Sequence, residues 1–195
     1  MVVGSGAGMP TQVKLYDSAA RRAIAVIAPF PRSFHGGVSV AASDVEGDRN
    51  ADLIVGSGAG TQATVDVFDG VTHELLDSFS PFAFFRGGVS VAAARLGGDA
   101  KADIVVGSGS GITAVVRAFA YQARTPLWSL DAFSSTFTGG SAVTTGAVGS
   151  AGPAVVLGAG AGGGSQVKVL DGTTHLLLAS FLGSPGSAAI SVAAG

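Results

Sequence analysis

The sequence predicts an all-β fold, a β-propeller built from four tandem repeats of about 51 residues. A glycine that closes an apolar run recurs at Gly4, Gly56, Gly107 and Gly158, in steps of 52, 51 and 51 residues. The runs around these glycines are rich in β-branched residues that alternate with small or polar ones, which is strand period. Four such runs fit in each unit, and four strands per repeat of roughly 40 to 50 residues is typical of a propeller blade. We therefore predict one repeat domain over residues 1–195.

The second repeat shows its predicted strands in order. The runs are VSVAAS (38–43), DLIVGSG (52–58), TVDVFD (64–69) and LLDSF (75–79). Gly, Asp, Asn, Ser and Thr fill the segments between them, as expected for turns. No segment carries a sustained helical stripe of apolar residues, so we expect almost no helix.

The two ends of the chain carry complementary halves of one repeat. The segment ISVAAG from Ile190 matches the first strand at Val38, and MVVGSGAG at the N-terminus matches the second strand at Leu53. Pairing them would remove two open sheet edges. We therefore expect a monomer with four blades of four antiparallel strands, closed by the N- and C-terminal strands. Two alternatives stay open: an arbitrary fragment boundary, or two chains that exchange end strands in an eight-bladed homodimer.

Composition excludes several classes of protein. Hydrophobic residues make up 47% and charged residues 12%, the opposite of the balance in disordered chains. The net charge of -2 gives no basic surface for nucleic acid. Without cysteine, disulfides and Cys-ligated zinc are excluded. No apolar run is long enough to insert into a membrane, and the N-terminus lacks the pattern of a signal peptide.

One acidic loop is the candidate metal site. Carboxylates stand at its first, third, fifth and ninth positions, and the Asn50 carbonyl can add a ligand. Oxygen ligands so spaced can converge on Ca²⁺. The alternative is an acidic turn whose side chains accept hydrogen bonds from backbone amides. The candidate ligands are Asp44, Glu46, Asp48, Asn50 and Asp52.

The other repeats have lost this acidic set. The third retains only Asp99 and Asp103, and the fourth, over 147–154, has no carboxylate. We therefore expect at most one calcium ion per chain.

The recurrent polar residues of the repeats do not form a recognisable catalytic group. His73 and His175 share a register, but both stand in a turn where a positive φ is expected, and His tolerates it. The Gly-Ser-Gly segments lack the lysine and helix of a phosphate loop. Repetition in every copy favours a structural need for small residues. We predict no catalytic residues and no enzymatic activity.

Four segments together resemble the FG-GAP repeats of integrin α-subunits and bacterial surface proteins. They are GGVSVAAS, DVEGDRNAD, LIVGSGAG and VDVFDG. The resemblance implies a propeller, usually of seven blades, with calcium between the first and second strands of some repeats. Glu46 and Arg49 depart from the family pattern, which usually has Asp or Asn and Gly there.

The resemblance also implies a role and a location. It indicates a non-enzymatic structural or interaction module, extracellular or at the cell surface, whose partner is a protein or a carbohydrate. The alternatives are a propeller domain of a larger secreted enzyme and an eight-bladed homodimer with a lectin-like or adhesive role.

Overall fold

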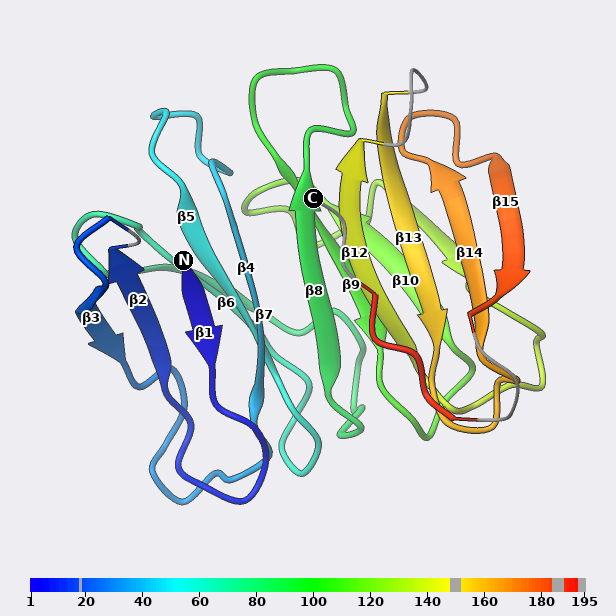
Figure 1. Ribbon diagram of the computed structural model, residues 1–195, viewed down its shortest axis with the longest axis horizontal. Helices are drawn as coiled ribbons and strands as arrows, with labels where there is room; N and C mark the ends of the chain where they lie inside the picture. Colours follow the sequence, from blue (N-terminus) through cyan, green and yellow to red (C-terminus); the bar gives the residue numbers. More distant parts are fainter. Residues whose placement is uncertain (18, 148–151, 184–187, 193–195) are drawn as a thin grey trace.

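A computed structural model describes residues 1–17, 19–147, 152–183 and 188–192. Its strands form four antiparallel sheets, each a blade, arranged side by side in an arc (Figure 1). Blade 1 has β1 (Val2–Gly4), β2 (Val13–Asp17) and β3 (Arg22–Ile27). Blade 2 has β4 (Val38–Ser43), β5 (Asp52–Ser57), β6 (Val65–Phe68) and β7 (Leu75–Phe79). Blade 3 has β8 (Val89–Ala94), β9 (Asp103–Ser108), β10 (Val115–Phe119) and β11 (Trp128–Asp131). Blade 4 has β12 (Ser141–Ala147), β13 (Pro153–Ala159), β14 (Gln166–Asp171) and β15 (Leu177–Leu182).

The predicted strands of the second repeat are confirmed. Each sheet is a meander in which consecutive strands pair, so each strand is joined to its neighbour by a single loop or turn. The register places Val40 opposite Val55 and Gly56 opposite Val65. The described residues include no helix, as expected. None of them forms a helix long and apolar enough to cross a membrane.

Blade 1 departs from the prediction of four strands. β1 pairs with β2, and the described residues provide no strand for its other edge. The expected partner, from Ile190 onward, instead lies against blade 4, where the Ile190 N–H donates to the Ala159 carbonyl at 3.0 Å. In Figure 1 this segment runs in front of blade 4, apart from β1. Residues 193–195, the rest of this predicted strand, lie outside the described ranges, as do 148–151 of the fourth acidic-loop equivalent.

Three apolar cores hold the arc together, one at each junction between successive blades. This placement follows from the sheets: each blade buries apolar side chains against its neighbour. The core between blades 1 and 2 contains Val13, Leu15, Leu53, Val55 and Phe68. The core between blades 2 and 3 includes Val45, Ile54, Val67, Phe79 and Phe119. The core between blades 3 and 4 includes Val105, Val116, Val155, Leu157 and Leu170.

Candidate metal centre

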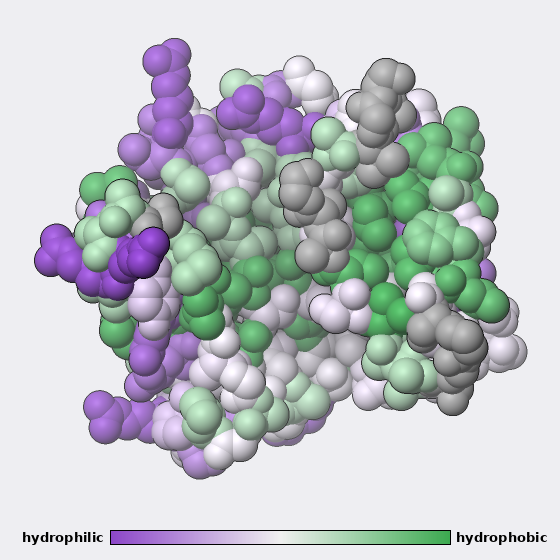
Figure 2. All heavy atoms as spheres, in the orientation of Figure 1, coloured by the Kyte–Doolittle hydropathy of each residue, from purple (hydrophilic) through white to green (hydrophobic). Residues whose placement is uncertain are grey.

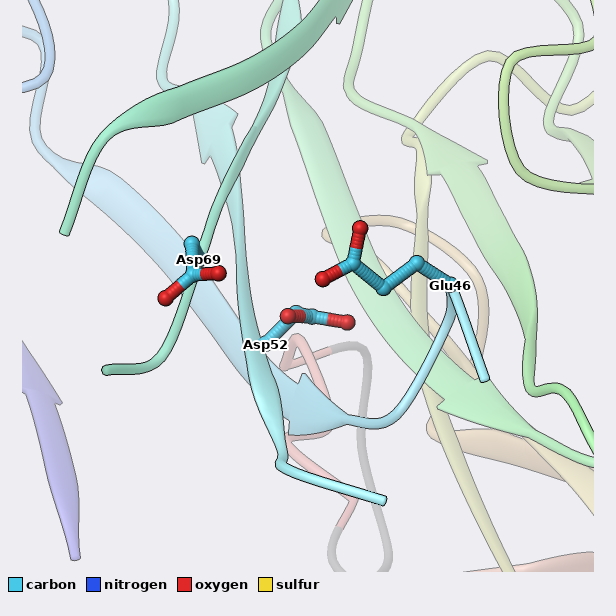
Figure 3. Close-up of side chains that lie close together, drawn as sticks. All are labelled: Glu46, Asp52 and Asp69. Carbon is cyan, nitrogen blue, oxygen red and sulfur yellow. The ribbon is translucent and has the colours of Figure 1, made fainter. Parts of the chain in front are cut away.

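Three carboxylates meet at the end of blade 2 where β5 begins and β6 ends. Carboxylate oxygens of Glu46, Asp52 and Asp69 all lie within 4.8 Å of one another. Asp52 opens β5 and Asp69 follows β6; because Leu53 lies opposite Phe68, the antiparallel register makes these two aspartates neighbours. Glu46 reaches them from the loop between β4 and β5. In Figure 3 the Asp52 carboxylate lies between those of Glu46 and Asp69.

Asp52 is the buried member of this triad. Only 1% of its surface is exposed. Its Oδ2 accepts a hydrogen bond from the Val45 N–H at 2.9 Å, but its Oδ1 is buried and has no partner within the described part of the chain. A buried carboxylate oxygen without a partner is costly. A cation held between the three side chains would supply that partner.

The pKa directions reflect the crowding of negative charge. Loss of hydration raises the pKa of Glu46, and the charges of Asp52 and Asp48 add to the rise. Burial raises the pKa of Asp52, although the nearby N–H groups of Val45 and Glu46 offset part of this. A divalent cation would relieve both effects, because opposite charge favours the ionised carboxylates.

Asp69 behaves differently from its two neighbours. Its Oδ1 accepts hydrogen bonds from the Thr72 N–H at 2.6 Å and the Val71 N–H at 2.8 Å. These two donors, with Thr72 first, lower the pKa of Asp69. Asp69 therefore stays ionised down to lower pH than a free aspartate and offers a charged oxygen to the centre.

The structure divides the predicted ligands into two groups. Glu46 and Asp52 belong to the triad. Asp44 instead accepts hydrogen bonds from the Gly47 and Arg49 N–H groups at 2.6 and 2.9 Å. Asp48 accepts from both the N–H and the side-chain amide of Asn50, at 2.7 Å each. Asp44, Asp48 and Asn50 thus form the hydrogen-bonded acidic turn that was the alternative reading of this loop.

The same loop also joins blade 2 to blade 3. The Ala102 N–H donates to the Asp44 carbonyl at 2.8 Å. The Lys101 side chain lies over Gly47, where an added Cβ would be 3.0 Å from Lys101 Cε. Both Gly47 (φ 91°) and Arg49 (φ 74°) are left-handed, which fixes the tight path of the loop. Ordering this loop therefore affects a blade junction as well as the triad.

The third repeat has only one of the three carboxylates of the triad. Asp103 occupies the position of Asp52, but its Oδ2 accepts from the Leu96 and Gly97 N–H groups at 3.2 and 2.9 Å. Gly97 stands where the second repeat has Glu46, and Ala120 stands where it has Asp69. Asp103 thus has neither carboxylate partner. Within the described residues, the group around Asp52 is the one that brings three potential metal ligands together.

The two recurrent histidines are turn residues, as predicted. His73 has φ 63° and His175 has φ 61°. Their N–H groups donate to the carbonyls of Asp69 and Asp171, at 3.0 and 2.9 Å. Both adopt the left-handed conformation that the sequence indicated for this position.

Asp69 was not among the predicted ligands. Its recurrence with Asp17 and Asp171 marks the repeat and the turn after the third strand. The signal that identifies it is the strand register. The first residue of a second strand and the residue that follows the third strand lie at the same end of an antiparallel pair.

Comparison with known proteins supports the fold. No family model matches the chain, and no curated protein sequence matches it. Among solved structures, that of U3-55K is similar, with a TM-score of 0.61 and 17% sequence identity. The similarity covers 97% of this chain and 50% of that one, so this chain spans about half the length of the structure it matches. Together with the sheet topology, this similarity establishes a β-propeller fold.

Proposed function

We propose that this β-propeller is a non-enzymatic structural or interaction module of the FG-GAP type that binds one Ca²⁺ at the Glu46–Asp52–Asp69 triad. The observation that carries the proposal is the buried Asp52 oxygen, which has no hydrogen-bond partner among the described residues and lies beside two further carboxylates. The same loop contacts blade 3 through the hydrogen bond from the Ala102 N–H to the Asp44 carbonyl, so a bound cation would also stabilise that blade junction.

Calcium fits these ligands better than other common metals do. The triad offers hard oxygen atoms, whereas zinc and copper sites draw on nitrogen or sulfur. Ca²⁺ takes six to eight oxygens in flexible geometry, and nearby loop carbonyls and water can complete its shell. Mg²⁺ requires a tighter octahedron and gives up water reluctantly. The long, flexible side chain of Glu46 suits the ion with the less demanding geometry.

The inner cavity supports a non-catalytic role. Its volume is about 550 Å³, and the first strands of blades 2, 3 and 4 surround it together with Ser191 and Val192. Its lining side chains are Ser, Thr, Ala and Val, so none can act as a general acid or base at neutral pH. An extracellular or cell-surface location and a protein or carbohydrate partner follow from the FG-GAP resemblance. They belong to the same proposal.

Thermal unfolding in the presence of calcium tests the metal site. We expect the melting temperature to rise with Ca²⁺ and to fall with a chelator, with about 2.7 kcal/mol of stabilisation at a hundredfold excess over the dissociation constant. Mg²⁺ should act weakly. Glu46→Gln, at a partly exposed position, should abolish the response without threatening the fold, and Asp52→Asn should do the same.

Asp103→Asn is the matched control. It changes the equivalent aspartate of the third repeat, which lacks the other two carboxylates, so its response to calcium should equal that of the parent chain. A chain whose melting is indifferent to calcium, or a Glu46→Gln variant that keeps the full response, would contradict the proposed site.

A further inference from the structure

The blade junctions follow a rule that can be read from the structure. At each one, an apolar residue of the fourth strand shares a core with an apolar residue of the next blade's third strand. At the junction of blades 2 and 3, the ring centroids of Phe79 and Phe119 lie 5.1 Å apart. The three pairs are Ile27 with Phe68, Phe79 with Phe119, and Leu130 with Leu170.

Each end of the arc carries one member of such a pair, and the described residues do not supply the other member. Phe181 lies opposite Val167, as Phe79 lies opposite Val65, so the two phenylalanines are equivalent. Phe79 is 7% exposed, but Phe181 is 53% exposed. Tyr16 stands at the position of Phe119 and is only partly buried. The last blade thus presents the donor side of a junction and the first blade presents the acceptor side.

The exposed side of blade 4 is broadly apolar. Every residue of β15 is exposed, whereas β7 of blade 2 is half buried by blade 3. Figure 2 shows apolar side chains gathered over blade 4, at the right of the view. An apolar surface of this kind marks a site of association. The large exposed side chains are Leu176, Leu177, Leu178, Phe181 and Leu182.

The segment from Ile190 to Val192 lies where the first strand of a further blade would lie. A Cβ built at Gly158 would be 2.9 Å from both the Ile190 carbonyl oxygen and Val192 Cγ1. At Gly4, the Val38 carbonyl oxygen and Val40 Cγ1 take the equivalent places, at 3.1 Å each.

The backbone hydrogen bonds of the two segments agree as well. The Ile190 N–H donates to the Ala159 carbonyl at 3.0 Å, just as the Val38 N–H of blade 2 donates to the Ser5 carbonyl at 3.0 Å. Residues 190–192 are therefore seated as a first strand, and no second strand in the described chain pairs with them.

β1 is the complement of that segment. It corresponds to β5, which pairs with β4 on one side and β6 on the other, yet β1 pairs only with β2 among the described residues. Its Val3 is 43% exposed. An open strand edge of this kind is a template for pairing with another chain.

We infer that two copies of this chain join head to tail at both ends and form an eight-bladed ring. Each copy gives residues 190–192 to β1 of the other and packs Phe181 against its Tyr16. The second copy is the occupant because each end is made for the other. The structural similarity covers 97% of this chain but only 50% of the U3-55K chain, so a propeller fold can be longer than this arc. A twofold axis then satisfies both ends, and the assembly closes.

The register of the exchanged strand follows from blade 2. Ser39 lies opposite Gly56 and Val40 opposite Val55. By equivalence, Ser191 of one copy lies opposite Gly4 of the other, and Val192 lies opposite Val3. This inference does not depend on the calcium site, which lies within a single chain.

Engineered cysteines test the register, since the chain has none of its own. A Val3→Cys chain mixed with a Val192→Cys chain should form a disulfide-linked dimer on oxidation. A mixture of Arg21→Cys and Val192→Cys chains, which places the thiol on a distant turn, should not. A double Val3→Cys, Val192→Cys chain that oxidises only within the monomer would show intrachain closure and overturn the inference.

Solution mass gives the second readout. Light scattering should report about 38 kDa, twice the 19.0 kDa of one chain. Phe181→Glu should give a folded monomer, because this side chain is already exposed within one copy. Val71→Glu changes an exposed apolar residue away from both ends and should leave the dimer intact. A parent chain of 19.0 kDa at micromolar concentration would refute the ring.

Discussion

Single residues in the left-handed conformation shape the turns of this propeller. Arg21, His73 and His175 occupy equivalent positions after the third strand, with φ of 53°, 63° and 61°. A non-glycine residue pays for this conformation with steric strain. The preceding aspartate compensates, because its side chain accepts N–H groups of the same turn, as Asp69 and Asp171 do.

The two histidine turns differ in one contact, which allows a matched prediction. The ring of His175 lies 4.7 Å from that of Trp128 in blade 3, between centroids. His73→Gly should leave the free energy of unfolding nearly unchanged, because relief of strain offsets the added freedom of the unfolded chain. His175→Gly should lose a further ~0.5–1.5 kcal/mol with the aromatic contact. Urea unfolding measures both, and equal losses would contradict a stabilising role for the ring contact.

Strand pairing explains how much of the site the sequence could reveal. Regular spacing of Gly4, Gly56, Gly107 and Gly158 was enough to predict the blades, since each repeat builds the same meander. The spacing of carboxylates within the loop of residues 44–52 led to Glu46 and Asp52. Asp69 was missed because it is far from Asp52 in the sequence. The pairing of β5 with β6 brings the two aspartates together.

The open ends were beyond sequence reasoning for a different reason. The match between residues from Ile190 and the first strand at Val38 predicted a strand, and residues 190–192 lie at the position of a first strand without pairing as one within the described chain. It could not tell which chain would supply its partner, because that depends on the curvature accumulated over the arc. Small differences in the angle between successive blades add up along the arc, and they decide whether residue 190 can reach β1 of the same chain.

A buried carboxylate between two outer strands gives the fold a pH dependence. Asp66 of β6 is almost fully buried and lies opposite Ser78 of β7, whose Oγ donates to its Oδ1 at 2.6 Å. Burial raises the pKa of Asp66 above its ordinary value of 3.8; the Ser78 hydrogen bond opposes this rise, and the charge of Asp77 adds to it. The folded chain therefore binds the Asp66 proton more tightly than the unfolded chain does.

In the calcium-free chain, the stabilising contribution of Asp66 should be lost as the pH rises. The contribution of Asp66 is complete below the pKa of the unfolded chain and is lost as the pH rises through the higher folded pKa. We expect the difference in urea midpoint between the parent chain and Asp66→Asn to change with pH, with the parent chain favoured more at acidic than at neutral pH. Asp66→Asn should raise the midpoint at neutral pH.

Asp171→Asn should act in the opposite direction. Hydrogen bonds, first from the Thr174 N–H, lower the pKa of Asp171, so its contribution is present at neutral pH and lost on acidification. The variant should therefore be less stable than the parent chain at neutral pH. For Asp66, the contradicting result would be a lower urea midpoint of Asp66→Asn than of the parent chain at neutral pH, since burial of the charged Asp66 side chain would then not be costly.

At the scale of the whole molecule, stability is distributed junction by junction. Each of the three cores draws on two successive blades. Proteins of this kind behave as chains of coupled neighbours, so a local gain in stability spreads only to adjacent repeats. The acidic loop couples two of them, because Asp44 accepts the Ala102 N–H of blade 3.

Hydrogen exchange should therefore show a local response to calcium. The ion would tie the loop of residues 44–52 to β5 and to Asp69, and through Asp44 to Ala102. We expect amides of β5, β6 and Ala102 that exchange by local opening to slow by up to about a hundredfold at a hundredfold excess of Ca²⁺ over its dissociation constant. Amides of β14 should change little, because blade 4 touches neither the triad nor its loop. Equal protection in all four blades would mean that the arc opens as one cooperative unit, and the junction-by-junction account of its stability would then be wrong.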